Sequence, residues 1–120
     1  MSGAVLTHPS DLRFTPRNAI LVQCGLKLAT TRRSAHGSVG DEFELGGTRF
    51  YIRAIIETTL WRVAEEAYLL EGEPSPGYFL DEWCRCYGTT VDQVDVHQRV
   101  FLHVFSAIYP FVPALGGRRA

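Results

Sequence analysis

Two β-prone runs separated by a Gly-Gly pair restrict the fold of this chain more than any other feature. Phe43-Glu44-Leu45 precedes Gly46-Gly47, and Thr48–Ile56 follows it. Glycine adopts the positive φ angles of tight hairpin turns without a steric penalty. The sequence therefore predicts an antiparallel β-hairpin here, which commits the middle of the chain to a sheet.

The second run of the hairpin alternates between two kinds of side chain. Successive side chains of a strand point to opposite faces. The two faces consist of Phe50, Ile52 and Ala54 on one side and Arg49, Tyr51 and Arg53 on the other. The first set belongs in a core. The second set is basic and aromatic, so it could hold phosphate and stack a base, or it could simply be the solvated outside of a barrel.

A hydroxyl residue followed by proline marks the start of two helices, at Thr15-Pro16 and Ser75-Pro76. The hydroxyl caps the first turn, and proline suits the first helical position. Glycines at positions 25 and 88 end these helices, so the second should run from Pro76 to about Tyr87. Apolar residues at helical spacing predict a third helix over Leu60–Leu70.

Three further segments should complete the sheet. They are Leu12–Phe14, Leu28–Arg33 and a stretch rich in β-branched and aromatic residues at 99–109. The order of elements predicts an α+β fold, a small β-barrel of about five to six strands with about three flanking helices. We expect its core to contain Phe50, Ile52, Leu102 and Val104, or their immediate neighbours.

With 120 residues, of which 46% are apolar and 21% charged, the chain has the character of one soluble domain. It has no apolar run of about 20 residues, the length that spans a membrane, and no start typical of a secreted protein. We therefore expect a cytoplasmic protein without a membrane partner. The three cysteines and four histidines lack metal-ligand spacing, so we expect neither metal nor cofactor. The oligomeric state is left open.

Charge is unevenly distributed along the chain. Residues 1–56 carry seven basic and four acidic side chains, whereas residues 57–97 carry two basic and nine acidic ones. A basic first half can favour a polyanion. Acidic residues on helix surfaces, such as Glu65 and Asp81, explain the middle region equally well.

The basic side chains of the first half are concentrated in the segment GLKLATTRR. It contributes Lys27, Thr30, Thr31, Arg32 and Arg33, and no acidic residue lies between Asp11 and Asp41. The segment is either a solvated strand whose cations pair with Glu42 or Glu44, or the wall of a pocket for an anionic or polar ligand. His36, in the glycine-containing loop that follows, is a further candidate for this pocket.

Three blocks of the sequence resemble the ASCH domain, a PUA-like fold. Their patterns are Gly-x-Lys-x-x-Thr-x-Arg, Gly-Asp before a strand, and Glu-Gly before a capped helix with a tryptophan and a tyrosine. The matching residues are Gly25, Lys27, Thr30 and Arg32, then Gly40 and Asp41, then Glu71, Gly72, Ser75, Trp83 and Tyr87. The resemblance implies a domain over residues 12–109, an N-terminal arm over residues 1–11 and a C-terminal tail over residues 110–120.

The resemblance also implies a link to RNA, because PUA-like folds commonly bind it. One bacterial ASCH branch, the acetylcytidine amidohydrolases, removes the acyl group from the exocyclic nitrogen of cytidine. The catalytic set of that branch falls by motif on Lys27, Thr30 and Glu71. Leu28 departs from the branch, which often has threonine there, and the EGEPS spacing also occurs in relatives without established activity.

Amide hydrolysis requires a nucleophile, a base and an acid. Thr30 could attack with Lys27 as base and Glu71 as acid, or a charged Lys27 could hold an oxyanion while Glu71 activates water. In a straight strand Lys27 and Thr30 would point to opposite faces. A shared site therefore requires Lys27 to lie in the turn after Gly25.

Three functions remain open on this basis. The favoured one is binding of RNA or a modified nucleoside in a cleft lined by Lys27, Thr30, Arg32 and Glu71. Further candidate ligand-binding residues are Arg33, His36, Arg49, Tyr51 and Arg53. The alternatives are hydrolysis of acetylcytidine or a similar small amide, and a protein-interaction domain without chemistry.

Overall fold

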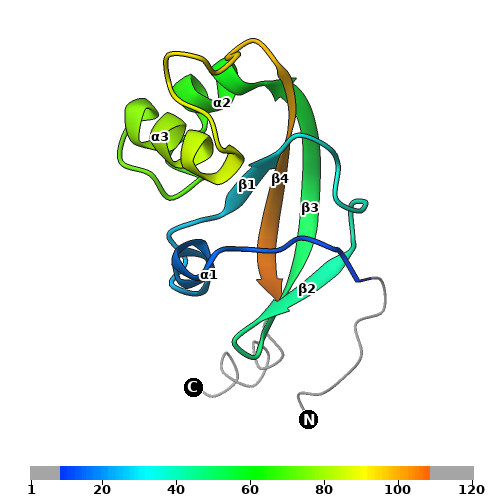
Figure 1. Ribbon diagram of the computed structural model, residues 1–120. Helices are drawn as coiled ribbons and strands as arrows, with labels where there is room; N and C mark the ends of the chain where they lie inside the picture. Colours follow the sequence, from blue (N-terminus) through cyan, green and yellow to red (C-terminus); the bar gives the residue numbers. More distant parts are fainter. Residues whose placement is uncertain (1–8, 109–120) are drawn as a thin grey trace.

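The computed structural model describes residues 9–108, so residues 1–8 of the expected arm and the expected tail lie outside it. Three helices and four strands make up this part of the chain (Figure 1). In order they are α1 (Pro16–Gln23), β1 (Ala29–Arg32), β2 (Glu42–Leu45), β3 (Thr48–Thr59), α2 (Leu60–Glu66), α3 (Pro76–Tyr87) and β4 (Arg99–Ile108). None of these helices is long and apolar enough to cross a bilayer.

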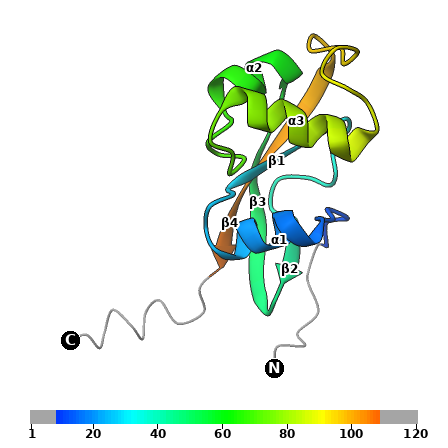
Figure 2. The same cartoon turned by 60° about the vertical axis from the view of Figure 1, so that its left-hand side comes forward.

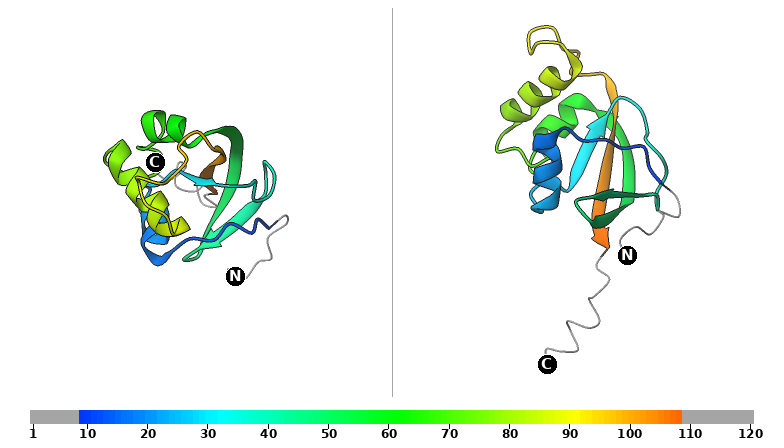
Figure 3. Two further views of the ribbon diagram at one scale, coloured as in Figure 1. Left: turned by 45° about the horizontal axis from the view of Figure 1, so that its top comes forward. Right: turned by 60° about the horizontal axis from the view of Figure 1, so that its bottom comes forward.

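The four strands form one antiparallel sheet in the order β1-β4-β3-β2. The predicted hairpin is confirmed: Phe43 pairs with Phe50, and the turn residues Gly46 and Gly47 have φ angles of 57° and 84°. The sheet curls into a half-barrel, which is visible along its axis in Figure 3. Helices α1 and α3 lie on the same side of this sheet (Figure 2).

The predicted number of strands was too high, since residues 9–108 contain four. Leu12–Phe14 was predicted as a strand but runs alongside the sheet without joining it. The reason is local hydrogen bonding, because the Leu12 amide donates to Ser10 Oγ at 3.1 Å. A single bridge, between Pro9 and Glu42, connects the chain just before this segment to β2.

The capped helices are confirmed. Thr15 Oγ1 accepts a hydrogen bond from the Asn18 amide, and Ser75 Oγ accepts one from the Tyr78 amide. Helix α3 has the predicted bounds. Helix α2 is shorter than predicted, because the chain turns at Ala67 instead of continuing to Leu70.

The alternation predicted for β3 holds only for its first half. Phe50 and Ile52 are buried, but the register with β4 shifts between Ile52 and Ala54, which leaves Arg53 in a β-bulge. A bulge inserts one unpaired residue and changes the faces that follow. Ile56 is accordingly 47% exposed.

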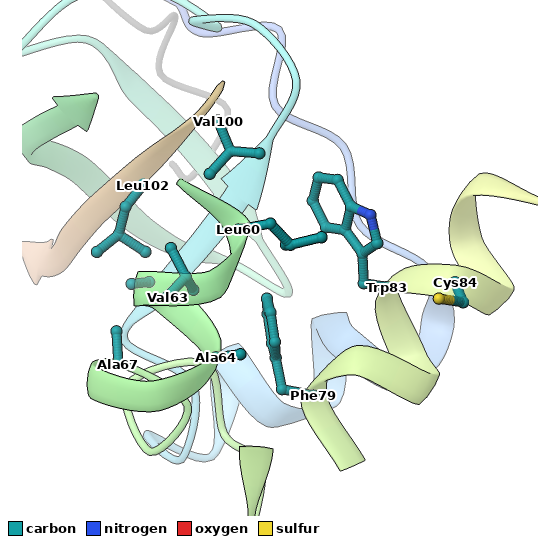
Figure 4. Close-up of a cluster of buried hydrophobic side chains, with 10 residues drawn as sticks. Leu60, Val63, Ala64, Ala67, Phe79, Trp83, Cys84, Val100 and Leu102 are labelled. Atoms are coloured by element: carbon teal, nitrogen blue, oxygen red, sulfur yellow. The ribbon is translucent and has the colours of Figure 1, made fainter. Parts of the chain in front are cut away.

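Two apolar clusters hold the domain together. The first joins α2 and α3 to β1 and β4, and in Figure 4 Phe79 and Trp83 of α3 point toward Ala64 and Leu60 of α2. The second combines the rings of Phe43, Phe50 and Phe105 with the aliphatic side chains of Leu12, Val22 and Ile52. Predicted core residues Phe50, Ile52 and Leu102 are buried, and half-buried Val104 has the buried neighbours His103 and Phe105.

Candidate ligand-binding cavity

A cavity of about 270 Å³ opens where four parts of the chain meet. Its walls come from α1 and the residues just before it, the segment 27–32, the turn after α2, and α3. Lys27, Thr30, Arg32 and Glu71, which the sequence placed in one cleft, all line it. Thr31 lines it as well.

A buried polar network lies in the wall of this cavity. Lys27 Nζ donates to Glu71 Oε1 at 2.7 Å and to the Glu71 carbonyl oxygen at 3.2 Å. Thr31 Oγ1 donates to the second carboxylate oxygen, Oε2, at 2.5 Å. Lys27, Glu71 and Thr31 are only 4%, 3% and 5% exposed. Each carboxylate oxygen thus has a partner, the condition under which a buried charge is tolerated.

The backbone around Gly72 brings the two halves of this network together. The amides of Leu28 and Ala29 both donate to the Leu70 carbonyl oxygen, at 2.7 and 3.0 Å. Gly72 has a φ of +82°, and a Cβ there would lie 3.2 Å from the Leu26 carbonyl oxygen and 3.3 Å from Lys27 Cβ. Glycine therefore suits this place for two reasons, its backbone angle and the close approach of the neighbouring chain.

Lys27 lies in the turn between α1 and β1, which is the position that a site shared with Thr30 requires. Gly25, with a φ of +80°, opens this turn, and the Lys27 amide donates to the Leu21 carbonyl oxygen at 3.0 Å. The alternative of a solvated strand whose cations pair with Glu42 or Glu44 is wrong. Lys27 is buried and pairs with Glu71, and Glu42 pairs with Arg49. Within residues 9–108, neither Arg32 nor Glu44 forms an ion pair.

The two threonines of β1 have different partners. The Thr30 hydroxyl accepts hydrogen bonds from Arg32 Nε and Nη2, at 3.3 and 3.2 Å, and within residues 9–108 it makes none to Lys27 or Glu71. The hydroxyl that contacts the carboxylate belongs to Thr31. Sequence reasoning selected Thr30 by motif and missed Thr31, because only the path of the turn that carries Glu71 decides between neighbouring hydroxyls.

Arg32 is held at the cavity by neutral groups. Its Nη2 donates to the Arg13 carbonyl oxygen at 2.7 Å, and its guanidinium lies 5.3 Å from the centre of the Phe14 ring. Burial lowers the pKa of Arg32, although charges such as that of Glu71 act in the opposite direction. The next guanidinium, of Arg33, lies 4.3 Å from the centre of the Tyr87 ring.

Arg17 links α1 to two carboxylates of the cavity wall. It binds both carboxylate oxygens of Glu73, at 3.0 and 3.1 Å, and lies 3.7 Å from Glu82. The hydrogen bond with Glu73 raises the pKa of Arg17. Burial alone would raise the pKa of Glu82, but the hydrogen bond from Arg85 and the charge of Arg17 bring it below its ordinary value. These two acids are therefore neutralised by arginine.

Aromatic side chains of α3 form the remaining wall. Phe79, Trp83 and Tyr87 line the cavity, and the Trp83 and Tyr87 ring centres are 4.2 Å apart. Phe79 and Trp83 also belong to the apolar cluster of Figure 4. Packing of this kind fixes the rings, which gives the cavity a rigid surface suitable for stacking.

The other candidate residues lie elsewhere. Arg49, Tyr51 and Arg53 are on β3 and, like His36, do not line this cavity. The ring of His36 contacts Asp11 through Nδ1 at 3.1 Å. Its amide donates to Nε2 of His103 at 3.0 Å.

His103 is a fully buried histidine that sequence reasoning did not single out. Its Nε2 accepts the His36 amide, so Nδ1 carries the proton and donates toward the carbonyl oxygens of Phe101 and Thr30, at 3.0 and 3.3 Å. Burial lowers the pKa of His103, and the hydrogen bonds to these carbonyl oxygens oppose that effect. No cluster of three or more metal-ligating side chains occurs in residues 9–108.

The sequence matches no protein-family profile and no curated protein. Among solved structures, a high-resolution crystal structure of an ASCH domain from Lactobacillus crispatus JV V101 is similar, with a TM-score of 0.52 over 78% of this chain and 71% of that chain. This chain has the ASCH-domain fold. The two sequences are 17% identical, so the likeness concerns the ASCH fold, and function has to be argued from the cavity itself.

Proposed function

We propose that this ASCH-fold protein binds a nucleobase, of RNA or of a modified nucleoside, in the cavity between α1, β1 and α3. One observation carries the proposal: the buried network of Lys27, Glu71 and Thr31 shares a cavity of about 270 Å³ with the rings of Trp83 and Tyr87. The resemblance of the sequence motifs to RNA-associated ASCH domains points in the same direction.

The size and chemistry of the cavity suit a base. Pockets for drug-sized ligands measure about 300–1,000 Å³, so this smaller cavity suits a single small planar group. Bases stack on aromatic rings and present donors and acceptors along their edges. The Lys27 ammonium has three N–H donors, of which Glu71 takes two. The third N–H and the free lone pairs of the carboxylate remain for a base edge.

Tryptophan fluorescence can test this proposal directly. The chain contains two tryptophans, Trp61 and Trp83, so a Trp61→Phe background makes Trp83 the only reporter. We expect saturable quenching by at least one ribonucleoside, modified nucleoside or short single-stranded RNA. Lys27→Met should weaken that binding, whereas Arg62→Gln on α2 should leave it unchanged. Absence of a saturable response to every one of these ligands would exclude the proposal.

Hydrolysis is the second candidate function, and the contact between Thr31 and Glu71 favours it. A carboxylate that accepts a hydroxyl proton can activate that hydroxyl as a nucleophile. Thr31 Oγ1 would attack the acyl carbon and pass its proton to Glu71, while Lys27 holds the oxyanion. Glu71 would then return the proton to the departing amine, and water would hydrolyse the acyl-threonine ester.

Acetylcytidine turnover decides between the two functions. If the protein is a hydrolase of this kind, Thr31→Val should lower kcat by about 10²–10⁴-fold, and Thr30→Val should have a small effect. The reverse result would support the motif-based assignment of Thr30 as nucleophile. Wild-type protein that binds nucleosides without any turnover would leave binding as the function.

A further inference from the structure

Within residues 9–108, three arginines beside the cavity have no acidic partner. Arg17, Arg49, Arg62, Arg85 and Arg99 each pair with a carboxylate within 4.0 Å. Within residues 9–108, Arg13, Arg32 and Arg33 form no such pair, and neither does Arg53 in the β3 bulge. We call Arg13, Arg32 and Arg33 the arginine rim.

Contacts with neutral groups hold two members of the arginine rim, Arg32 and Arg33, against the cavity. Arg13 and Arg32 line it, and Arg32 is bound to the Arg13 carbonyl oxygen and to the Thr30 hydroxyl. Arg33 lies over the ring of Tyr87, which is also part of the cavity wall. The Nη1 group of Arg32 makes no hydrogen bond within residues 9–108.

The rest of the cavity is already balanced in charge. Lys27 is matched by Glu71, and Glu73 and Glu82 are matched by Arg17 and Arg85. In the part of the chain that the structure describes, the three positive charges of the arginine rim therefore have no counter-ion. Guanidinium groups bind phosphate through two parallel hydrogen bonds, and they do so more strongly where water is partly excluded. A neutral nucleoside would use none of these charges.

We propose that the arginine rim binds the phosphate of a nucleotide whose base occupies the cavity, so that the ligand is a phosphorylated nucleotide and not a free nucleoside. This inference rests on the proposed function. Arg32 contacts the phosphate from the cavity wall, and the more exposed Arg33 and Arg13 add charge from outside. The phosphate belongs either to a 5′-mononucleotide or to a phosphodiester strand, and both present the same chemistry to the rim.

Paired titrations test the phosphate subsite. Each of the four ribonucleosides is compared with its 5′-monophosphate by calorimetry or by Trp83 fluorescence in the Trp61→Phe background. We expect the monophosphate to bind about 10- to 100-fold more tightly, as one charge-assisted contact allows. Arg32→Gln should reduce this ratio to about one, because the loss of the guanidinium weakens monophosphate binding more than nucleoside binding. Arg33→Gln, at an exposed position, should reduce it about threefold, and Arg62→Gln should preserve it.

A six-nucleotide RNA identifies the source of the phosphate. If a strand is the ligand, the RNA should bind more tightly than the monophosphate, with a steeper loss of affinity as salt rises. If a mononucleotide is the ligand, the RNA should bind no better than the monophosphate. Either result supports the phosphate subsite, provided that Arg32→Gln weakens the binding.

Three results would overturn the proposal. Equal binding of nucleosides and their monophosphates by the wild type would remove the phosphate subsite and leave nucleobase binding intact. A phosphate advantage that survives in both Arg32→Gln and Arg33→Gln would place the phosphate elsewhere. Absence of binding by nucleosides, monophosphates and RNA alike would remove both this inference and the function on which it rests.

Discussion

The cavity and the face of β3 that carries Arg49, Tyr51 and Arg53 have similar compositions but different structures. Both combine arginines with aromatic rings, and the sequence suggested a ligand for each. In the cavity, Lys27 and Glu71 are buried and hydrogen-bonded to each other. On β3, Arg49 is half-buried and pairs with Glu42 across the hairpin, while Arg53 is exposed.

The difference shows why burial is more informative than composition. A surface ion pair contributes about 0–1 kcal/mol and is compatible with almost any function. Burial of two charges costs several kcal/mol for each ion, and apolar side chains of similar size often stabilise a fold equally well. A chain that buries Lys27 with Glu71 beside a cavity therefore has an arrangement that stability alone does not explain, and this singles out the cavity.

The largest effect should come from breaking the buried pair. Lys27→Met leaves the Glu71 carboxylate buried without its main partner, which should lower the free energy of unfolding by about 3–5 kcal/mol. The measurement is urea denaturation. The double variant Lys27→Met/Glu71→Leu should recover most of the loss, because no charge is left buried. A loss below about 1 kcal/mol in the single variant would make this pair equivalent to a surface pair.

The close packing that shapes the cavity can be tested at Gly72. Gly72→Ala should lower the free energy of unfolding by about 1–3 kcal/mol, because alanine is strained at positive φ and its Cβ would approach the Leu26 carbonyl oxygen. Gly47→Ala is the matched control, since Gly47 has a similar φ of +84° and nothing within 4 Å of an added Cβ. Equal losses of unfolding free energy in the two variants would show that the close approach of the Leu26 carbonyl oxygen does not affect stability.

Acid should weaken the domain through His103. Its pKa is lowered in the folded protein, so the unfolded chain binds a proton at higher pH than the folded chain does. Stability from this group is therefore complete above about pH 6.5 and is lost as the pH falls further, with a slope of at most about 1.4 kcal/mol per pH unit for one proton. The nearby His36 and Arg32 also disfavour a charge on His103.

Thermal melts between pH 7.5 and pH 5 measure this acid effect. His103→Gln should flatten the dependence on pH, because glutamine can still accept the His36 amide but does not titrate. His97→Gln, at an exposed histidine, should retain the slope of the wild type. If both variants keep that slope, the acid sensitivity has another source.

The smallest effect is expected on the β3 face. Arg49→Ala removes the ion pair with Glu42, whose side chains are partly exposed, and should change the free energy of unfolding by less than about 1 kcal/mol. It should also leave ligand affinity unchanged. A loss of RNA or nucleotide affinity comparable to that of Lys27→Met would restore this face as the binding site.

Local signals predicted most of the helices and the hairpin. The Thr15-Pro16 and Ser75-Pro76 caps and the Gly46-Gly47 turn are short-range features, whose chemistry acts within a few residues. The strand predicted at Leu12–Phe14 is absent, because pairing between strands depends on residues far apart in the chain. Ser10 satisfies the Leu12 amide instead.

The cavity was predictable only in outline. Motif resemblance selected Lys27 and Glu71, which are 44 positions apart in the chain and form a direct ion pair. The role of Thr31 depends on where the turn after α2 lies against β1, and the burial of His103 depends on the loop that carries His36. Neither arrangement leaves a periodic or local signal in the sequence.

Chemical-shift mapping by NMR distinguishes directly between the cavity and the β3 face as the place where the ligand binds. The protein is titrated with a nucleoside 5′-monophosphate or a short single-stranded RNA, and amide and indole signals are followed. We expect the largest shifts at the Trp83 indole and at the amides of Lys27, Thr30 and Glu71. Shifts confined to Arg49, Tyr51 and Arg53, with the Trp83 signal unmoved, would contradict this expectation.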